Sequence, residues 1–132
     1  MQPLMQTDSE QLLHAGLAVG QRTFDQLLAH AGPRENFGAT VCHQVGGTHR
    51  KMMLESLSMP TETDFTTFRW LGNTGSVALP LALALGLQSG GLAANSQVAL
   101  LGIGSGINSV MMSTTWPNPI VAGNLDENAH RN

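Results

Sequence analysis

The chain has 132 residues, of which 42% are hydrophobic and only 11% carry a charge. This length allows one folded domain but not comfortably two, and the net charge of −3 argues against a nucleic-acid-binding surface, which needs a basic stripe. Because a globular domain normally has about 25% charged residues, we expect a partner to cover part of the surface.

The single cysteine excludes an internal disulfide and favours a reducing compartment. The polar amino terminus has no apolar signal-peptide segment. The longest apolar run, from Val77 to Leu87, is too short to cross a bilayer. We therefore expect a cytoplasmic protein without a membrane span.

Residues 1–6 are expected to be loose. Thr7 and Glu10 then have the spacing of a capping box, which predicts the start of an amphipathic helix that ends at Gly32-Pro33. Further along the chain, two helices are predicted over residues 48–58 and 76–87. Four strands are predicted over residues 37–42, 65–70, 97–103 and 107–116, with a tight glycine turn at 104–106.

Strands that alternate with helices predict an α/β fold with helices on the faces of a mixed sheet. Residues 7–116 form the expected domain, and the polar, Asn-rich residues 117–132 are expected to be a disordered tail. The helix over residues 76–87 is apolar all round, and such a helix must be buried all round. A chain this short has hardly enough material for that, so we expect a second layer from another chain or a missing half.

Functional groups of open α/β sheets collect beyond the carboxyl ends of the strands. Three such places stand out: His43 follows the first strand, Asn73 follows the second, and the glycine turn at 104–106 follows the third. We expect two polar side chains and a backbone donor to converge there. Taken singly, a histidine after a strand is more often structural than catalytic, and such glycine turns are common.

The motifs around these residues resemble a known family. Cys42-His43-Gln44-Val45, Leu71-Gly72-Asn73-Thr74-Gly75 and Leu100-Leu101-Gly102-Ile103-Gly104-Ser105-Gly106 occur in this order at family-like intervals. They resemble the carboxyl-terminal half of β-ketoacyl-acyl-carrier-protein synthase III, of the thiolase superfamily, and especially its relatives that join two acyl thioesters head to head in olefin biosynthesis. The resemblance runs from about Asp8 to Trp116. It implies one half of a thiolase-like layered fold, with a buried central helix.

The resemblance also implies roles for individual residues. His43 and Asn73 match the family's catalytic histidine and asparagine, which donate hydrogen bonds to the thioester carbonyl of the second substrate. The backbone amide of Ser105 matches a donor of the other oxyanion hole, and Gly104 and Gly106 allow close approach there. The implied reaction is a Claisen condensation of acyl-CoA or acyl-carrier-protein thioesters, without a metal or other cofactor.

The family's nucleophilic cysteine belongs to an amino-terminal half that this sequence lacks. Cys42 is expected to face away from its neighbour His43 and to be a buried core thiol. The spacing of Cys42, His43 and His49 does not support a zinc site. We therefore expect an enzyme half that is inactive alone and pairs with a cysteine-bearing half or a homologous subunit.

Two alternatives remain open at this point. The chain is a non-catalytic acyl-binding or assembly subunit, or it is a truncated fragment without a function of its own. Arg50 and Lys51 are expected on a solvated helix face, with contact to a phosphopantetheine arm or carrier protein as the second interpretation. Met52, Met53 and Leu57 are expected to be packing residues, with a place near an acyl tunnel as a further interpretation.

Overall fold

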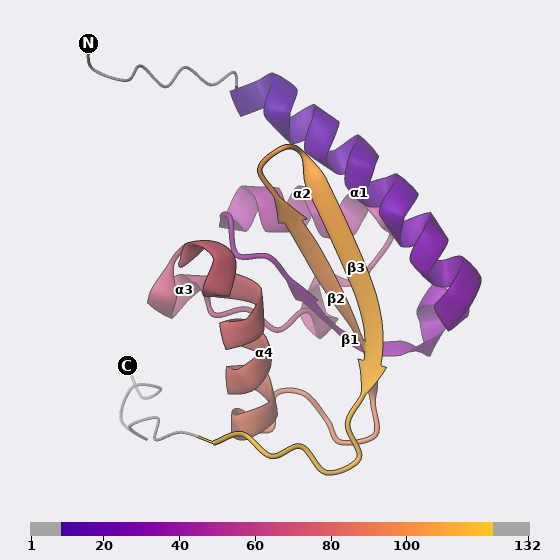
Figure 1. Ribbon diagram of the computed structural model, residues 1–132, viewed down its shortest axis with the longest axis vertical. Coiled ribbons are helices and arrows are strands. Elements are labelled where there is room, and N and C mark those ends of the chain that lie inside the picture. Colours follow the sequence, from indigo (N-terminus) through magenta and orange to yellow (C-terminus); the bar gives the residue numbers. More distant parts are fainter. Residues whose placement is uncertain (1–8, 123–132) are drawn as a thin grey trace.

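Three strands form one mixed sheet in the computed structural model, which describes residues 9–122 (Figure 1). They are β1 (Phe37–Cys42), β2 (Gln97–Gly104) and β3 (Asn108–Thr115), in the order β1-β2-β3. β1 and β2 are parallel. β2 and β3 are antiparallel and are connected by a short hairpin. The α/β class and these three strands confirm the sequence-based predictions to within a residue or so at each end.

Helices cover both faces of this sheet (Figure 1). They are α1 (Ser9–Ala31), α2 (Gly47–Ser56), the short α3 (Phe68–Leu71) and α4 (Ala78–Ser89). Single 3-10 turns occur at Arg34–Asn36 (η1), Thr61–Thr63 (η2) and Gly75–Val77 (η3). α1 and α2 pack on one face, and α4 packs on the other, against β1 and β2.

The face covered by α1 and α2 holds the larger core. Phe24 of α1 and Leu54 of α2 are almost fully buried there, against Leu101 of β2. Gly20 lets α1 come close, because a Cβ at this position would lie 3.0 Å from the Met53 sulfur. The predicted amphipathic stripe of the first helix is confirmed in this packing, and Met53 and Leu57 are core residues as expected.

The face covered by α4 is only partly closed. Ala78, Ala82, Leu85 and Gly86 are buried, whereas Pro80 on the opposite side of the helix is exposed. On the same face of the sheet, Val110 and Met112 of β3 keep 66% and 55% of their surface exposed. Within the described residues, the apolar helix is therefore buried on one side, and its other side has no covering layer.

The predicted strand over residues 65–70 is wrong. The segment makes a single parallel bridge between Asp64 and Thr40 and then turns into α3. Its β-branched and aromatic residues favour a strand. However, the Asp64 carboxylate accepts the Cys42 N–H, and the Gln44 side chain accepts the N–H groups of the following loop. Side chains thus occupy the positions that a strand ladder would fill.

The structure does not describe either end of the chain. Thr7 of the expected capping box and residues 1–6 lie outside the described residues, as do residues 123–132. Residues 117–122 contain neither helix nor strand. The expected domain limits of 7 and 116 therefore stay predictions. In the described part of the chain, no helix is long and apolar enough to cross a bilayer.

Candidate active site

His43 lies directly after β1, where its backbone N–H donates to Leu101 O of β2 at 3.0 Å. This bond continues the parallel pairing by one residue, so the backbone that carries the imidazole is fixed by the sheet. The side chain is partly buried, and this desolvation lowers its pKa below the ordinary value. The imidazole is therefore neutral at neutral pH, with one ring N–H as a donor.

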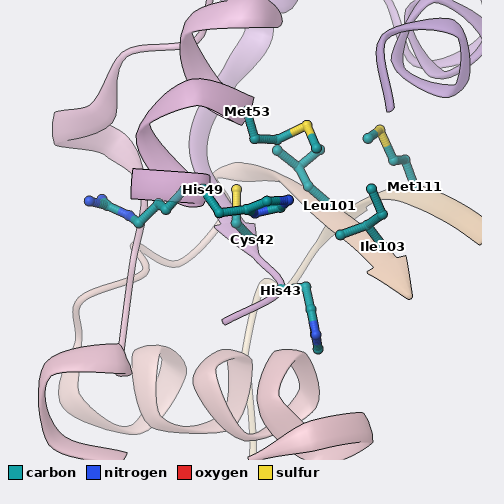
Figure 2. A pocket seen from close by; sticks show the side chains of 8 residues that line it. Cys42, His43, His49, Met53, Leu101, Ile103 and Met111 are labelled. Atoms are coloured by element: carbon teal, nitrogen blue, oxygen red, sulfur yellow. The ribbon is translucent and has the colours of Figure 1, made fainter. Parts of the chain in front are cut away.

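Cys42 and His43 point in opposite directions (Figure 2). The Cys42 thiol is 3% exposed and belongs to the core cluster of α1 and α2. Burial raises its pKa well above the ordinary value, and the nearby negative charge of Asp64 raises it further. Because the thiolate is the nucleophilic form, this geometry fits the expected packing role of Cys42.

Asn73 lies in the loop between α3 and α4, two residues before η3. Its side chain is exposed, and its Oδ1 accepts the Gly75 N–H at 2.9 Å. This local turn fixes the amide group with the oxygen occupied. Within residues 9–122, the Nδ2 group has no hydrogen-bond partner, so the side chain presents an N–H donor to its surroundings.

The expected glycine turn is the hairpin between β2 and β3. Gly104 is the last residue of β2, and Ser105 and Gly106 form the turn that follows, all three exposed. Ser105 O accepts a hydrogen bond from Asn108 Nδ2 at 2.8 Å, which ties the turn together. Gly106 has φ of 135°, a conformation that favours glycine, and a Cβ at Gly104 would meet open space.

The topology brings these residues to one end of the sheet. β1 and β2 are parallel, so His43 and the hairpin at Gly104 both lie at the end of the sheet where these two strands finish. Side-chain alternation puts Val41 in the α4 cluster and Cys42 in the opposite one, and His43 points away from Cys42 to the side of Val41. Asn73 lies in the segment between α3 and η3 that leads into α4.

A small hollow lies between α2 and the strands on the Cys42 side of the sheet, and His43 borders it although its ring points away from Cys42 (Figure 2). Its lining is mainly apolar, with two histidines and an arginine: Cys42, His43, His49, Arg50, Met53, Leu101, Ile103 and Met111. Desolvation lowers the pKa of His49, and the His43 imidazole lowers it further. The His49 ring lies beside the Cys42 sulfur in Figure 2.

The expectation of a solvated face at Arg50 is wrong. Arg50 Nε donates to Asp64 Oδ2 at 2.5 Å, and Nη2 donates to the carbonyl oxygens of Thr61 and Asp64. The guanidinium thus neutralises a carboxylate whose side chain is fully buried. Its neighbour Lys51 does lie on the exposed side of α2, 3.8 Å from Glu55. No sequence pattern predicts this ion pair, because Arg50 and Asp64 are 14 residues apart.

The described residues contain no group of three or more histidine, cysteine, aspartate or glutamate side chains that could hold a metal ion. The candidate site residues offer N–H donors: the imidazole of His43, the amide of Asn73 and the backbone at Ser105. Such donors suit the stabilisation of an oxygen that gains negative charge.

Comparison with known proteins gives the class of fold. Solved structures of thiolase-like condensing enzymes superpose on the chain with high scores. OleA of Xanthomonas campestris, solved with bound lauric acid and lauroyl-CoA, gives a TM-score of 0.78 at 32% identity over 83% of this chain and 33% of its own. 3-Oxoacyl-(acyl carrier protein) synthase III, FabH, of Pseudomonas aeruginosa gives 0.80 at 23% identity over 91% of this chain and 40% of its own, which supports the fold alone. The fold is thiolase-like.

Sequence comparison gives the family. The profile of the 3-oxoacyl-[acyl-carrier-protein (ACP)] synthase III C-terminal family matches residues 29–116, and the chain belongs to this family. An acyl-CoA:acyl-CoA alkyltransferase of Shewanella oneidensis is 39% identical over 113 residues, 85% of this chain and 32% of the relative. Beta-ketoacyl-[acyl-carrier-protein] synthase III of Pseudomonas aeruginosa is 31% identical over 58% of this chain and 23% of the relative. The chain thus spans about a third or less of these relatives.

Proposed function

We propose that this chain supplies the carboxyl-terminal part of a condensing enzyme that joins two acyl thioesters by a Claisen condensation. The observation that carries the proposal is the arrangement of His43 and Asn73. His43 directly follows β1 and Asn73 lies just before η3 and α4, and both offer N–H donors within a segment that matches the family from 29 to 116.

The proposed reaction has two stages. A cysteine thiolate outside this chain attacks the carbonyl of the first acyl thioester. The acyl group is transferred to the cysteine sulfur, and the thiol that carried it leaves. The α-carbon of the second thioester then loses a proton or CO₂ and attacks the acyl-enzyme carbonyl. A carbon–carbon bond forms, the carbon–sulfur bond to the enzyme breaks, and the free thiolate returns as a β-keto thioester is released.

His43 and Asn73 are proposed to bind the thioester carbonyl of the second substrate. When its α-carbon becomes a carbanion, negative charge moves onto that oxygen as an enolate. A neutral imidazole and a fixed amide both donate to this charge without bringing a negative group near it. The lowered pKa of His43 supports this role, because the neutral ring persists across the physiological pH range.

Ser105 is proposed to donate its backbone N–H to the other developing oxyanion, that of the acylated cysteine. The exposed hairpin supports this, since the open space beside Gly104 lets another part of the enzyme approach the backbone.

The partner that completes the site is proposed to be a cysteine-bearing thiolase-like half. Cys42 is an unsuitable nucleophile because it is buried, has a raised pKa and points away from His43. The uncovered apolar surface on the α4 side supports a partner layer, because monomers avoid large surfaces of this kind. It includes Val77, Val110 and Met112. The relatives' extra length of about two thirds provides such a layer.

Acyl-CoA thioesters are the proposed substrates. The identity to the relatives named acyl-CoA:acyl-CoA alkyltransferase, 39% and 34%, exceeds the 31% identity to the ketoacyl synthase of Pseudomonas aeruginosa and extends over more of the chain. Carrier-protein thioesters are the second candidate. A comparison of lauroyl-CoA with lauroyl-carrier protein as substrate distinguishes the two.

Reconstitution tests the proposal. The chain is co-expressed with the part of the Shewanella oneidensis relative that precedes its matched region, and the purified mixture receives lauroyl-CoA. We expect a stable complex that releases CoA thiol and forms a β-keto product detectable by mass spectrometry, with neither part active alone. A stable complex without turnover contradicts the proposal and favours the assembly-subunit alternative. Insolubility of the chain in every mixture favours the truncated-fragment alternative.

A further inference from the structure

Gln44 follows His43 and is 3% exposed, yet every polar atom of its side chain is hydrogen-bonded. Its Nε2 donates to Cys42 O at 2.5 Å. Its Oε1 accepts from Thr66 Oγ1 at 2.6 Å, from the Thr67 N–H at 3.2 Å and from the Phe68 N–H at 3.1 Å. One buried amide group therefore joins the end of β1 to the loop that starts α3.

These bonds connect the two candidate catalytic residues by a short path. Cys42 O belongs to the peptide group that precedes His43, so the Nε2 contact fixes the backbone under the imidazole. The Phe68 N–H is in the first turn of α3, and α3 ends at Leu71, two residues before Asn73. The Gly72 N–H donates to Phe68 O, which continues the rigid path to the asparagine.

From this geometry we infer that Gln44 is a positioning residue that sets the separation between His43 and Asn73. The inference rests on the proposed function, in which both side chains bind one carbonyl oxygen. Two donors act together on one atom only if their spacing is held to a fraction of an ångström, and a misplacement of about 1 Å costs roughly 100-fold in rate. Gln44 itself does not contact the substrate in the proposed reaction.

We call the four hydrogen bonds of the Gln44 side chain the brace. Three variants test its separate contacts. Gln44→Leu removes all four hydrogen bonds at similar volume. Gln44→Glu keeps an acceptor for the α3 loop but places an oxygen against Cys42 O. Thr66→Val is the mildest change, because it removes one of the three donors to Gln44 Oε1 and the second, longer bond of the Phe68 N–H, and leaves both backbone amides bonded to Oε1.

Gln97 provides a matched control. It is also a partly buried glutamine that joins two elements, since its Nε2 donates to Ala31 O at 3.1 Å and to Ser113 Oγ at 2.8 Å. It lies at the first residue of β2, at the far end of the sheet from Gly104. Gln97→Leu therefore removes a comparable bridge away from His43 and Asn73.

Two measurements are made on each variant. Amide hydrogen exchange and NMR shifts on the ¹⁵N-labelled chain report the brace without reference to activity. In Gln44→Leu we expect loss of protection at Thr67 and Phe68 and shifts of the Asn73, Gly75 and His43 ring signals. We expect smaller changes of the same pattern in Thr66→Val and none of them in Gln97→Leu. Unmoved Asn73 and His43 signals in Gln44→Leu would overturn the inference, whether or not the chain takes part in condensation.

The second measurement is steady-state kinetics of the reconstituted mixture with lauroyl-CoA. We expect kcat to fall by about 10- to 100-fold in Gln44→Leu and by severalfold in Thr66→Val, with KM within about twofold. Gln97→Leu is expected to retain kcat. Equal losses in Gln44→Leu and Gln97→Leu, or an unchanged kcat in Gln44→Leu, would show a merely structural role. A wild-type mixture without turnover would refute the proposed function, and the NMR measurement would still decide the brace.

Discussion

The two faces of the sheet differ in how far this chain completes them. The face under α1 and α2 is closed by a core that includes Phe24 and Leu54, and beside it Arg50 pairs with the buried Asp64 carboxylate. The face under α4 carries His43 and the approach to Asn73, and leaves Val110 and Met112 exposed. The larger core lies on the first face, and the proposed chemistry and the proposed partner are assigned to the second.

Removal of the cation on the closed face should have the largest effect. Arg50→Gln leaves the fully buried Asp64 carboxylate without its counter-ion. We expect a loss of about 3–5 kcal/mol in the free energy of unfolding, measured by urea denaturation of the isolated chain. Lys51→Gln is the control, because its pair with Glu55 is exposed and contributes less than about 0.5 kcal/mol. Similar losses in the two variants would contradict the role given to Arg50.

On the other face, His43→Ala should affect rate more than stability. The loss of one donor to a developing oxyanion lowers the rate by about 100- to 1,000-fold. The measurement is kcat/KM of the reconstituted mixture with lauroyl-CoA. His49→Ala, on the α2 side, is the comparison and should cost far less. If His49→Ala is the more damaging change, the active face has been assigned to the wrong side of the sheet.

The exposed strand positions give an intermediate effect. Val110→Ser combined with Met112→Ser should leave the unfolding free energy of the isolated chain within about 0.5 kcal/mol, since both side chains are already exposed. Affinity for the cysteine-bearing half should fall at least about tenfold, as measured by titration calorimetry. Unchanged affinity would mean that the partner covers some other surface.

The smallest effect concerns pH. Burial lowers the pKa values of His43 and His49 in the folded chain. The unfolded chain therefore takes up protons first as the pH falls. The histidine contribution is complete above the unfolded value near 6.5 and is lost as the pH falls through the lowered folded values. His49→Gln should make urea denaturation midpoints less sensitive to acidification from pH 7.5 to 5.

The fold was predictable where local pattern and packing agree. β1 and β2 are buried apolar runs, and the first helix has a clear stripe, so the limits of both strands and the end of the helix could be read from the sequence. The strand over 65–70 failed because Asp64 and Gln44 satisfy neighbouring backbone groups through their side chains. Such long-range polar contacts leave no periodic trace in the sequence.

The roles of the candidate site residues stay predictions, and the strand expected before Asn73 does not form. His43, Asn73 and Ser105 stood out because each follows a predicted strand or lies in a family motif. The opposite directions of Cys42 and His43 followed from strand alternation and are seen in the structure (Figure 2). The hydrogen bonds from the α3 loop to Gln44 were not expected, because their donors lie 22–24 residues away along the chain.

The side chain of Asp64 has a further consequence for assembly. It accepts the Cys42 N–H, while Thr40 O accepts the Phe65 N–H at 2.9 Å, so this stretch of the outer edge of β1 is already occupied. A foreign strand cannot extend the sheet there without displacing a buried carboxylate. Edge-to-edge growth, the usual route by which open sheets aggregate, is therefore directed to the opposite margin along β3.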